Sequence, residues 1–148
     1  LRVIAVDVAD SKLELAKKHG AEIGINAANT DPAAEVQEQV GGAHGVLVTA
    51  VHEQAFEQAI GMSRRGGTIV FNGLPAGTFD VSIFDVVLNG LTIRGSIVGT
   101  RQDMMEALEF YAAGKIKPTY QRRPLEDLNE VFDEMRNGEI DGRVVIEY

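Results

Sequence analysis

The sequence predicts an α/β fold built on a doubly wound, parallel sheet. Short apolar runs alternate with segments of helical periodicity, an order typical of parallel sheets with helices on both faces. The clearest run, residues 45–50, follows a glycine-rich stretch and is almost entirely apolar, as expected for a strand covered on both faces. No internal repeat interrupts this rhythm, so we expect one layered domain to fill most of the chain.

The individual elements follow from periodicity and from helix start and stop signals. The expected strands span residues 1–7, 21–25, 45–50, 68–72, 91–96 and 144–146. The first helix is expected to begin at a capping box of Ser11 and Glu14 and to end at Gly20. The other expected helices span 31–40, 53–62, 81–88, 104–112 and 128–135, and a turn at Gly66 and Gly67 precedes the fourth strand.

The last 30 or so residues depart from the alternating pattern. Pro118 and Pro124 bracket an extended stretch, and a helical stripe and a short closing strand follow it. We therefore expect a change of domain near Pro118, with residues 1–117 in the sheet domain and residues 118–148 in a separate C-terminal α/β segment.

Composition excludes several function classes. The chain has 148 residues, 45% of them hydrophobic and 24% charged, which is typical of a folded, soluble, cytoplasmic protein rather than a disordered one. A net charge of −8 and the absence of any basic run argue against nucleic acid as a partner. No stretch is apolar enough to predict a membrane span, and with no cysteine there is neither a disulfide nor a thiolate metal site.

Asp7 is the first candidate for chemistry. It ends an apolar strand, and an acid in that position of a dinucleotide-binding βαβ unit accepts hydrogen bonds from the adenosine ribose. The glycine-rich turn that precedes such an acid by about 20 residues is missing, because the sequence begins with the strand itself. We therefore expect the sequence to be part of a longer enzyme, truncated on its N-terminal side.

Several motifs, taken together, point to one family. They are Asp7 with Lys12, residues 18–21, 65–68, 72–75 and 95–99, and the closing residues 142–145. In this order, and through essentially all of the chain, they resemble the medium-chain zinc-dependent alcohol dehydrogenases, above all the bacterial ethanol-type enzymes. The resemblance implies a partial Rossmann-like NAD-binding domain over 1–117 and a piece of the catalytic domain over 118–148.

The resemblance also implies which residues bind the cofactor. Asp7 and Lys12 would hold the adenosine ribose, and Thr49, Ala50 and Val51 would line the path from adenine toward nicotinamide. Gly73 and Leu74 would lie against the nicotinamide, and the backbone of Ser96, Ile97 and Val98 would anchor its carboxamide. Arg143 would reach the pyrophosphate, for which a guanidinium fork is suited.

Each of these residues also has a purely structural interpretation. Val51 and its neighbours could be loop packing, Lys12 a solvated side chain, and Gly73 a glycine needed by the turn before Pro75. Arg143 could form a surface ion pair with Glu139 or Asp141.

Asp7 also favours NAD over NADP on physical grounds. Two like charges about 4 Å apart repel by up to roughly 4 kcal/mol at an effective dielectric constant near 20, so a carboxylate disfavours a 2′-phosphate on the ribose.

The implied activity is the interconversion of a small alcohol and its aldehyde, with hydride transfer to NAD and with zinc assistance in the intact enzyme. The sequence contains no catalytic residue of that family and no zinc ligand, so we expect this chain alone to be inactive. Two alternatives stay open: a reductase of polyols, sugars or quinones in the same superfamily, and a non-catalytic nucleotide-binding or assembly module. The exposed character of residues 91–98 predicts pairing of edge strands into a homo-oligomer, a dimer or tetramer.

The expected strand order has a further consequence for the sheet. In the order 3-2-1-4-5-6, the first strand of the unit lies between the strand at 1–7 and the strand at 45–50. We therefore expect a parallel sheet that lacks its first strand, with no ladder between those two segments. Either the natural chain or a co-purified fragment supplies that strand, or the sheet is split or filled by a neighbouring molecule.

Overall fold

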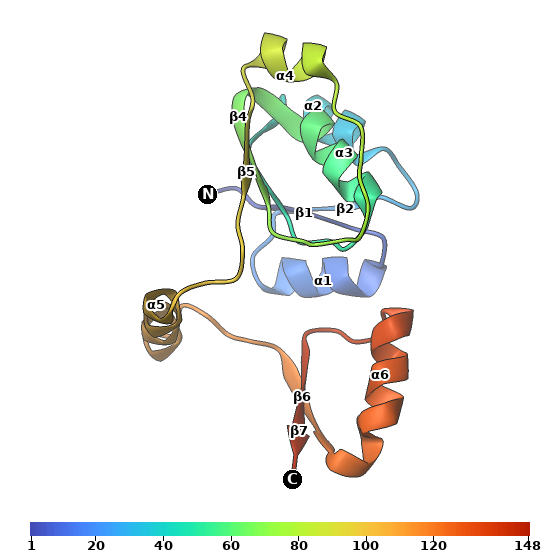
Figure 1. The fold of residues 1–148 in the computed structure, drawn as a ribbon, viewed down its shortest axis with the longest axis vertical. Coiled ribbons are helices and arrows are strands. Elements are labelled where there is room, and N and C mark those ends of the chain that lie inside the picture. The colour runs from blue at the N-terminus through green and yellow to red at the C-terminus, as the bar shows by residue number, and fades with distance from the viewer. The chain divides into compact units, whose positions relative to one another are not determined.

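The computed structural model describes residues 1–148 and divides them into two compact units, Leu1–Val98 and Gly99–Tyr148. Figure 1 shows the elements of both units, coloured from the N-terminus to the C-terminus. The first contains β1 (Ile4–Asp7), α1 (Asp10–Lys18), β2 (Ile23–Asn26), α2 (Pro32–Val40), β3 (Ala43–Val48), α3 (Glu53–Met62), β4 (Ser63–Phe71), α4 (Ile83–Asn89) and β5 (Thr92–Gly95). The second contains α5 (Arg101–Ala112), β6 (Tyr120–Pro124), the 3₁₀ turn η1 (Leu125–Asp127), α6 (Leu128–Asn137) and β7 (Arg143–Glu147).

The prediction of an α/β fold with parallel strands is confirmed. Every ladder is parallel, and in the first unit the strands form a pair β1-β2 and a three-stranded sheet in the order β3-β4-β5. The expected split is also found, since β1 ladders only onto β2 and not onto β3. The exposed strand β5 lies at the edge of its sheet, as its alternating sequence predicted.

The core of the first unit lies where α2 and α3 cover the strands (Figure 1). Apolar side chains from both sheets and both helices meet there, and the helices themselves are amphipathic, as expected. The buried cluster consists of Ile25, Val36, Val48, Phe56, Ala59, Met62 and Ile69. Because Ile4 and Val6 also pack against this cluster, the two sheets share one core although no ladder joins them.

Two local predictions for the first unit were wrong. The capping box of Ser11 and Glu14 does not form, because the N-cap of α1 is Ala9, two residues before Ser11, and no side chain caps this helix. The turn before that helix is instead closed by Asp7, whose Oδ1 accepts a hydrogen bond from the Ala9 amide at 3.0 Å. Likewise, Gly66 and Gly67 do not form a turn between a helix and a strand, because β4 already begins at Ser63. The two glycines lie inside β4, at the point where its register against β3 shifts.

Other local predictions hold. Asp31 caps α2 through a hydrogen bond from the Ala33 amide, and the helix ends at Gly41 in the left-handed conformation. Helix α3 has the predicted bounds, and the short helix expected over 81–88 forms as α4, which begins at Ile83 and ends at Asn89.

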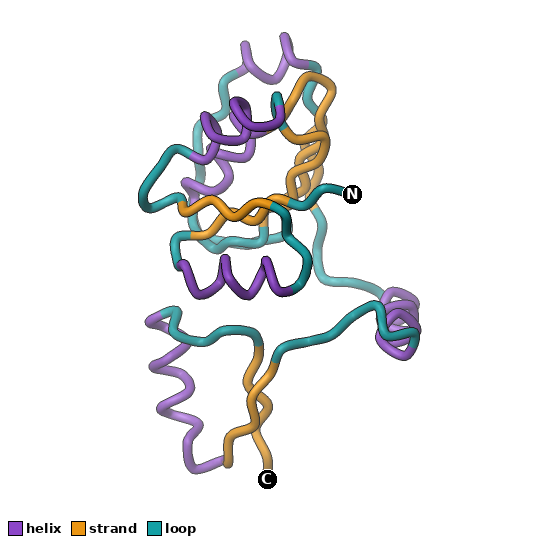
Figure 2. The backbone as a smooth tube through the Cα atoms, turned by 180° about the vertical axis from the view of Figure 1, so that it is seen from behind, coloured by secondary structure: helices purple, strands orange, loops and turns teal.

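The second unit has little apolar core. Strands β6 and β7 run side by side as a parallel pair, with α6 beside them (Figure 2). Val131 on α6 is the only buried residue between 99 and 148. Helix α5 has no buried side chain. The domain boundary expected near Pro118 stays a prediction.

Candidate functional site

The carboxyl end of β1 holds Asp7 in a fixed position. The residue is half-buried, one of its carboxylate oxygens accepts from the Ala9 amide, and its carbonyl oxygen accepts from the Ala27 amide at 3.0 Å. Beside it in the ladder is Asn26, whose side-chain Nδ2 donates to Asp10 Oδ1 at 2.6 Å. Lys12 lies in the first turn of α1 and is half-buried. A carboxylate is thus presented at a strand end, within a turn that its own backbone bonds keep rigid.

The second part of the candidate site is a cavity of about 590 Å³ at the carboxyl ends of β4 and β5. We call it the apolar pocket. It brings together five of the residues predicted from the sequence: Gly73, Leu74, Ser96, Ile97 and Val98. The remaining lining residues are Glu53, Phe56, Phe71, Asn72, Pro75, Gly77, Thr78, Phe79 and Gly95.

Backbone hydrogen bonds build the wall between the ends of β3, β4 and β5. The amides of Asn72 and Gly73 donate to the carbonyl of Val48 at 2.9 and 2.8 Å. The Ser96 amide donates to the carbonyl of Phe71 at 2.9 Å, and the Asn72 side-chain amide donates to the carbonyl of Ser96 at 3.2 Å. The segments 72–74 and 95–98 are therefore tied together by ladder-like bonds that continue past the strands.

Gly73 is required for a different reason from the one the sequence suggested. Its φ is not positive, so the turn before Pro75 does not need a left-handed residue here. A Cβ atom at position 73 would instead overlap the carbonyl oxygen of Ala50 and approach the carbonyl carbon of Thr49 to 3.1 Å. The glycine allows the loop after β3 to pass directly over the end of β4, which explains the packing role of Thr49 and Ala50. Both residues, like Val51, are exposed.

Three phenylalanines form one side of the apolar pocket. Phe56 comes from α3, Phe71 from the end of β4 and Phe79 from the loop before α4. The ring centroids are 4.8, 5.7 and 5.6 Å apart, and Phe71 and Phe79 meet edge to face at 84°. Such arrangements are favourable for aromatic rings, and the cluster continues the apolar core to the pocket surface.

Val98 lines the same pocket in a strained conformation. Its φ of 32° makes it the only non-glycine residue of the chain with a positive φ. A β-branched residue in this region is an outlier that costs on the order of 1–3 kcal/mol, and such residues cluster at binding sites.

A larger cavity, of about 1020 Å³, lies at the amino end of β4 and contains none of the predicted site residues. Open parallel sheets bind ligands at the carboxyl ends of their strands, so the apolar pocket is the better candidate although it is smaller.

Arg143 belongs to the second unit, where it begins β7. Its amide donates to the carbonyl of Thr119 at 3.0 Å, and its side chain is exposed. The ion pairs of this unit are made by Arg122, Arg123 and Arg136.

The chain's own residues do not fit a zinc ion. No group of three or more His, Cys, Asp or Glu side chains is arranged to hold a metal.

The structure contains no helix with both the length and the hydrophobicity of a membrane span.

Residues 1–113 match the family model described as zinc-binding dehydrogenase, which covers more than half of the chain. The chain belongs to the zinc-binding dehydrogenase family. An alcohol dehydrogenase of Moraxella sp. (strain TAE123) is 61% identical over all 148 residues, which span 44% of that relative. The chain thus spans less than half the length of the curated relatives it matches.

Solved structures of this family have the same fold. The benzyl alcohol dehydrogenase of Acinetobacter calcoaceticus matches with a TM-score of 0.88 at 27% identity, over 99% of this chain and 43% of that one. A solved NAD-dependent alcohol dehydrogenase matches with a TM-score of 0.84 at 30% identity, over 99% of this chain and 44% of that one. The family resemblance inferred from the sequence motifs is therefore confirmed.

Glu53 and the three phenylalanines were missed as site residues by the sequence analysis. Phe56 has the spacing of a helix face that packs on the core, and Phe79 lies in a loop without periodicity. The available signal was the position of Glu53, which follows the same strand end as Thr49 to Val51.

Proposed function

We propose that the chain is the cofactor-binding part of an NAD-dependent alcohol:aldehyde oxidoreductase. The observation that carries this proposal is the apolar pocket, which gathers Gly73, Leu74 and residues 96–98 at the carboxyl ends of adjacent parallel strands. A concave, mostly apolar site with a few backbone polar groups suits a flat aromatic ring that carries a carboxamide. Membership of the zinc-binding dehydrogenase family supports the same assignment.

In this proposal the residues of the chain bind, orient and exclude water. Asp7 accepts hydrogen bonds from the adenosine ribose, with Lys12 beside it, and Thr49 to Val51 line the path toward the pocket. The backbone at Ser96, Ile97 and Val98 anchors the carboxamide, while Leu74 and the phenylalanines exclude water from one face of the ring. When NAD is bound, it supplies the hydride acceptor for oxidation of a small alcohol. No step is assigned to zinc, because no residues of this chain fit it.

Arg143 is proposed as a ligand of the cofactor pyrophosphate. Its side chain is exposed, and a planar guanidinium fork suits bidentate contact with phosphate. We expect Arg143→Ala to weaken NAD binding by about 1.5–3 kcal/mol, the range for charge-assisted hydrogen bonds. Calorimetry that finds the affinity unchanged would contradict this role.

Assembly into a homo-oligomer is proposed from the edge strand β5. All four of its residues are exposed, and large apolar side chains continue on both sides of it: Ile83, Phe84 and Val87 on α4, and Ile97 beyond the strand. Exposed edges of this kind pair with other chains. Sedimentation that finds a folded monomer at micromolar concentration would exclude the proposal.

The proposed function is tested at Asp7. We expect Asp7→Ala to weaken NAD binding by about 1.5–3 kcal/mol and to weaken NADP binding less, because the variant removes the ribose acceptor and the repulsion of the 2′-phosphate together. Calorimetry with both cofactors measures the ratio. Asp10→Ala is the matched control, since Asp10 is a carboxylate in the same segment that faces Asn26 instead. An unchanged preference in Asp7→Ala would refute the ribose assignment.

A further inference from the structure

Glu53 is the only charged residue that lines the apolar pocket. It is the first residue of α3, and the other lining residues are apolar, aromatic, glycine or uncharged polar residues. Glu53 is exposed, and as the single carboxylate at an otherwise uncharged cavity it makes the electrostatic potential at the pocket mouth negative.

The carboxylate of Glu53 lies against the pocket wall. A Cβ atom on Gly77 would overlap Glu53 Oε1 and lie 3.0 Å from its Cδ, so the carboxylate rests on the backbone of the loop that closes the pocket. Gly77 also has a φ of +127°, a conformation that side chains rarely adopt. The loop between β4 and α4 therefore needs a glycine at position 77, because a side chain there would overlap the carboxylate of Glu53.

No cation of the chain pairs with Glu53. The ion pairs of the first unit join Arg2 with Glu22 and Lys17 with Glu14. The negative charge at the pocket is therefore not neutralised by a lysine or arginine side chain.

The phenylalanines add a second attraction for positive charge. Phe71 and Phe79 line the pocket and are half-buried. The π faces of aromatic rings attract cations, by about 0.5–1 kcal/mol at exposed sites. A carboxylate and aromatic faces together favour a ligand that is flat, apolar and positively charged.

We propose that the apolar pocket selects a planar cation, and that Glu53 makes it favour the oxidised, positively charged nicotinamide ring over the neutral, reduced ring. The identity of the ring rests on the proposed function. Glu53 is then a specificity-determining residue, since it sets the ratio of affinities for the two redox states of the cofactor.

Glu53 also has a structural effect that the test must separate. A carboxylate in the first turn of a helix stabilises that helix through the macrodipole. This effect is the same with and without a ligand, and it does not distinguish a charged ring from a neutral one. The informative readout is therefore the ratio of two affinities rather than stability or a single affinity.

The experiment compares 1-methylnicotinamide, a cation, with nicotinamide, its neutral counterpart. Both are titrated into the 148-residue chain, and dissociation constants are taken from the NMR shifts of the Gly73, Gly95 and Ser96 amides. We expect the wild type to bind the cation more tightly. Glu53→Gln should reduce the ratio of affinities about two- to fivefold, the range for one exposed charge or cation–π contact.

Matched variants sharpen the comparison. Glu57→Gln removes the same charge one turn further along α3 from a residue that does not line the apolar pocket, and it should leave the ratio unchanged. Glu53→Asp keeps the charge and should retain part of the preference even where Glu53→Gln disturbs the start of α3. Added salt should lower the preference of the wild type, because screening weakens exposed charge interactions.

The outcomes separate the two proposals. Equal affinities for both probes in the wild type, with shifts confined to the pocket amides, would overturn the role of Glu53 and leave the proposed function standing. If neither probe shifts the pocket amides at the highest soluble concentration, both proposals fail. Equal loss of preference in Glu57→Gln and Glu53→Gln would assign the effect to the net charge of the protein and overturn the inference.

Discussion

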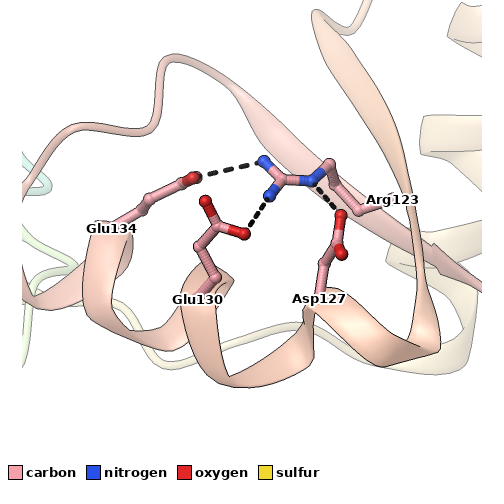
Figure 3. Close-up of polar contacts among 4 residues, drawn as sticks. All are labelled: Arg123, Asp127, Glu130 and Glu134. Carbon is pink, nitrogen blue, oxygen red and sulfur yellow. Dashed lines mark hydrogen bonds and ion pairs between the residues drawn. The ribbon is translucent and has the colours of Figure 1, made fainter.

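The two units of the chain are stabilised by different forces. In the first, seven buried apolar residues from both sheets and two helices form one core. In the second, Val131 is the single buried residue, and the most connected side chain is Arg123 on β6. Its three guanidinium nitrogens contact Asp127, Glu130 and Glu134 at 2.9, 3.1 and 3.2 Å (Figure 3).

This difference teaches which perturbations each unit should resist. Apolar burial stabilises by about 25 cal/mol for each Å² removed from water and depends little on salt. Partly exposed ion pairs contribute much less, and salt screens them. The first unit should therefore respond mainly to changes of side-chain volume, and the second mainly to changes of charge, salt and pH.

The largest effect is expected in the core of the first unit. Ile69 is fully buried on β4, the central strand of its sheet, so Ile69→Ala should lower the free energy of unfolding by about 2–5 kcal/mol through lost burial and a residual cavity. Urea denaturation measures this. The control is Val8→Ala, where the side chain is 67% exposed and the change should stay within about 0.5 kcal/mol.

A smaller effect is expected where the pocket wall is built by close backbone approach. Gly73→Ala places a methyl group against the carbonyl of Ala50 and should cost about 1–3 kcal/mol, the range for overpacking. Gly95→Ala, in the same pocket, meets nothing within 4 Å and has no positive φ, so it should be close to neutral. Equal thermal stability of the two variants would contradict this prediction, because it would mean that the backbone at Ala50 moves away from the added methyl group at little cost.

In the second unit, Arg123→Met should loosen α6 without affecting the core of the first unit. The variant removes the guanidinium and leaves three carboxylates near one another, so amide exchange in α6 should speed up. Arg136→Met, on α6 itself, is the control, because Arg136 pairs only with Asp133 and is largely exposed. Equal exchange in the two variants would mean that the Arg123 cluster adds nothing beyond surface pairing.

The smallest effect concerns pH at the start of α5. Hydrogen bonds from the Thr100 amide and hydroxyl lower the pKa of Asp103 below its ordinary value of 3.8. The pKa of Asp103 is lower in the folded chain than in the unfolded chain, so this cap stabilises α5 fully at pH values above the ordinary pKa. The stabilisation is lost as pH falls through the lowered pKa of the folded chain. NMR shifts of α5 between pH 6 and pH 2 should follow this loss, and Asp103→Asn should remove the dependence.

The sequence predicted best the features that depend on local chemistry. Asp31 and Pro32 begin α2, and the bounds of α3 are as predicted, since caps and periodicity are properties of neighbouring residues. The sequence-based prediction failed where a side chain interacts with a partner other than the one that its local motif suggests. Ser11 and Glu14 form no capping box because α1 already begins at Asp10, and Glu14 pairs with Lys17.

The same distinction applies to the candidate site. Gly73, Leu74 and residues 96–98 converge because the carboxyl ends of adjacent parallel strands share one edge, and strand order is predictable. Glu53 and Phe79 converge only because the loop of residues 72–80 folds back over α3, which no periodic pattern encodes.

The uniformly parallel ladders also determine how the chain must fold. Ile4 pairs with Ile23, Thr68 with Thr92 and Tyr120 with Arg143, so no two strands can pair as a hairpin before a helix-length crossover has formed. Each ladder must therefore close a loop of many residues before its hydrogen bonds can compensate the lost entropy, which slows folding. Stopped-flow refolding should be much slower than that of a helical bundle of the same length, and a microsecond phase with full amplitude would contradict this expectation.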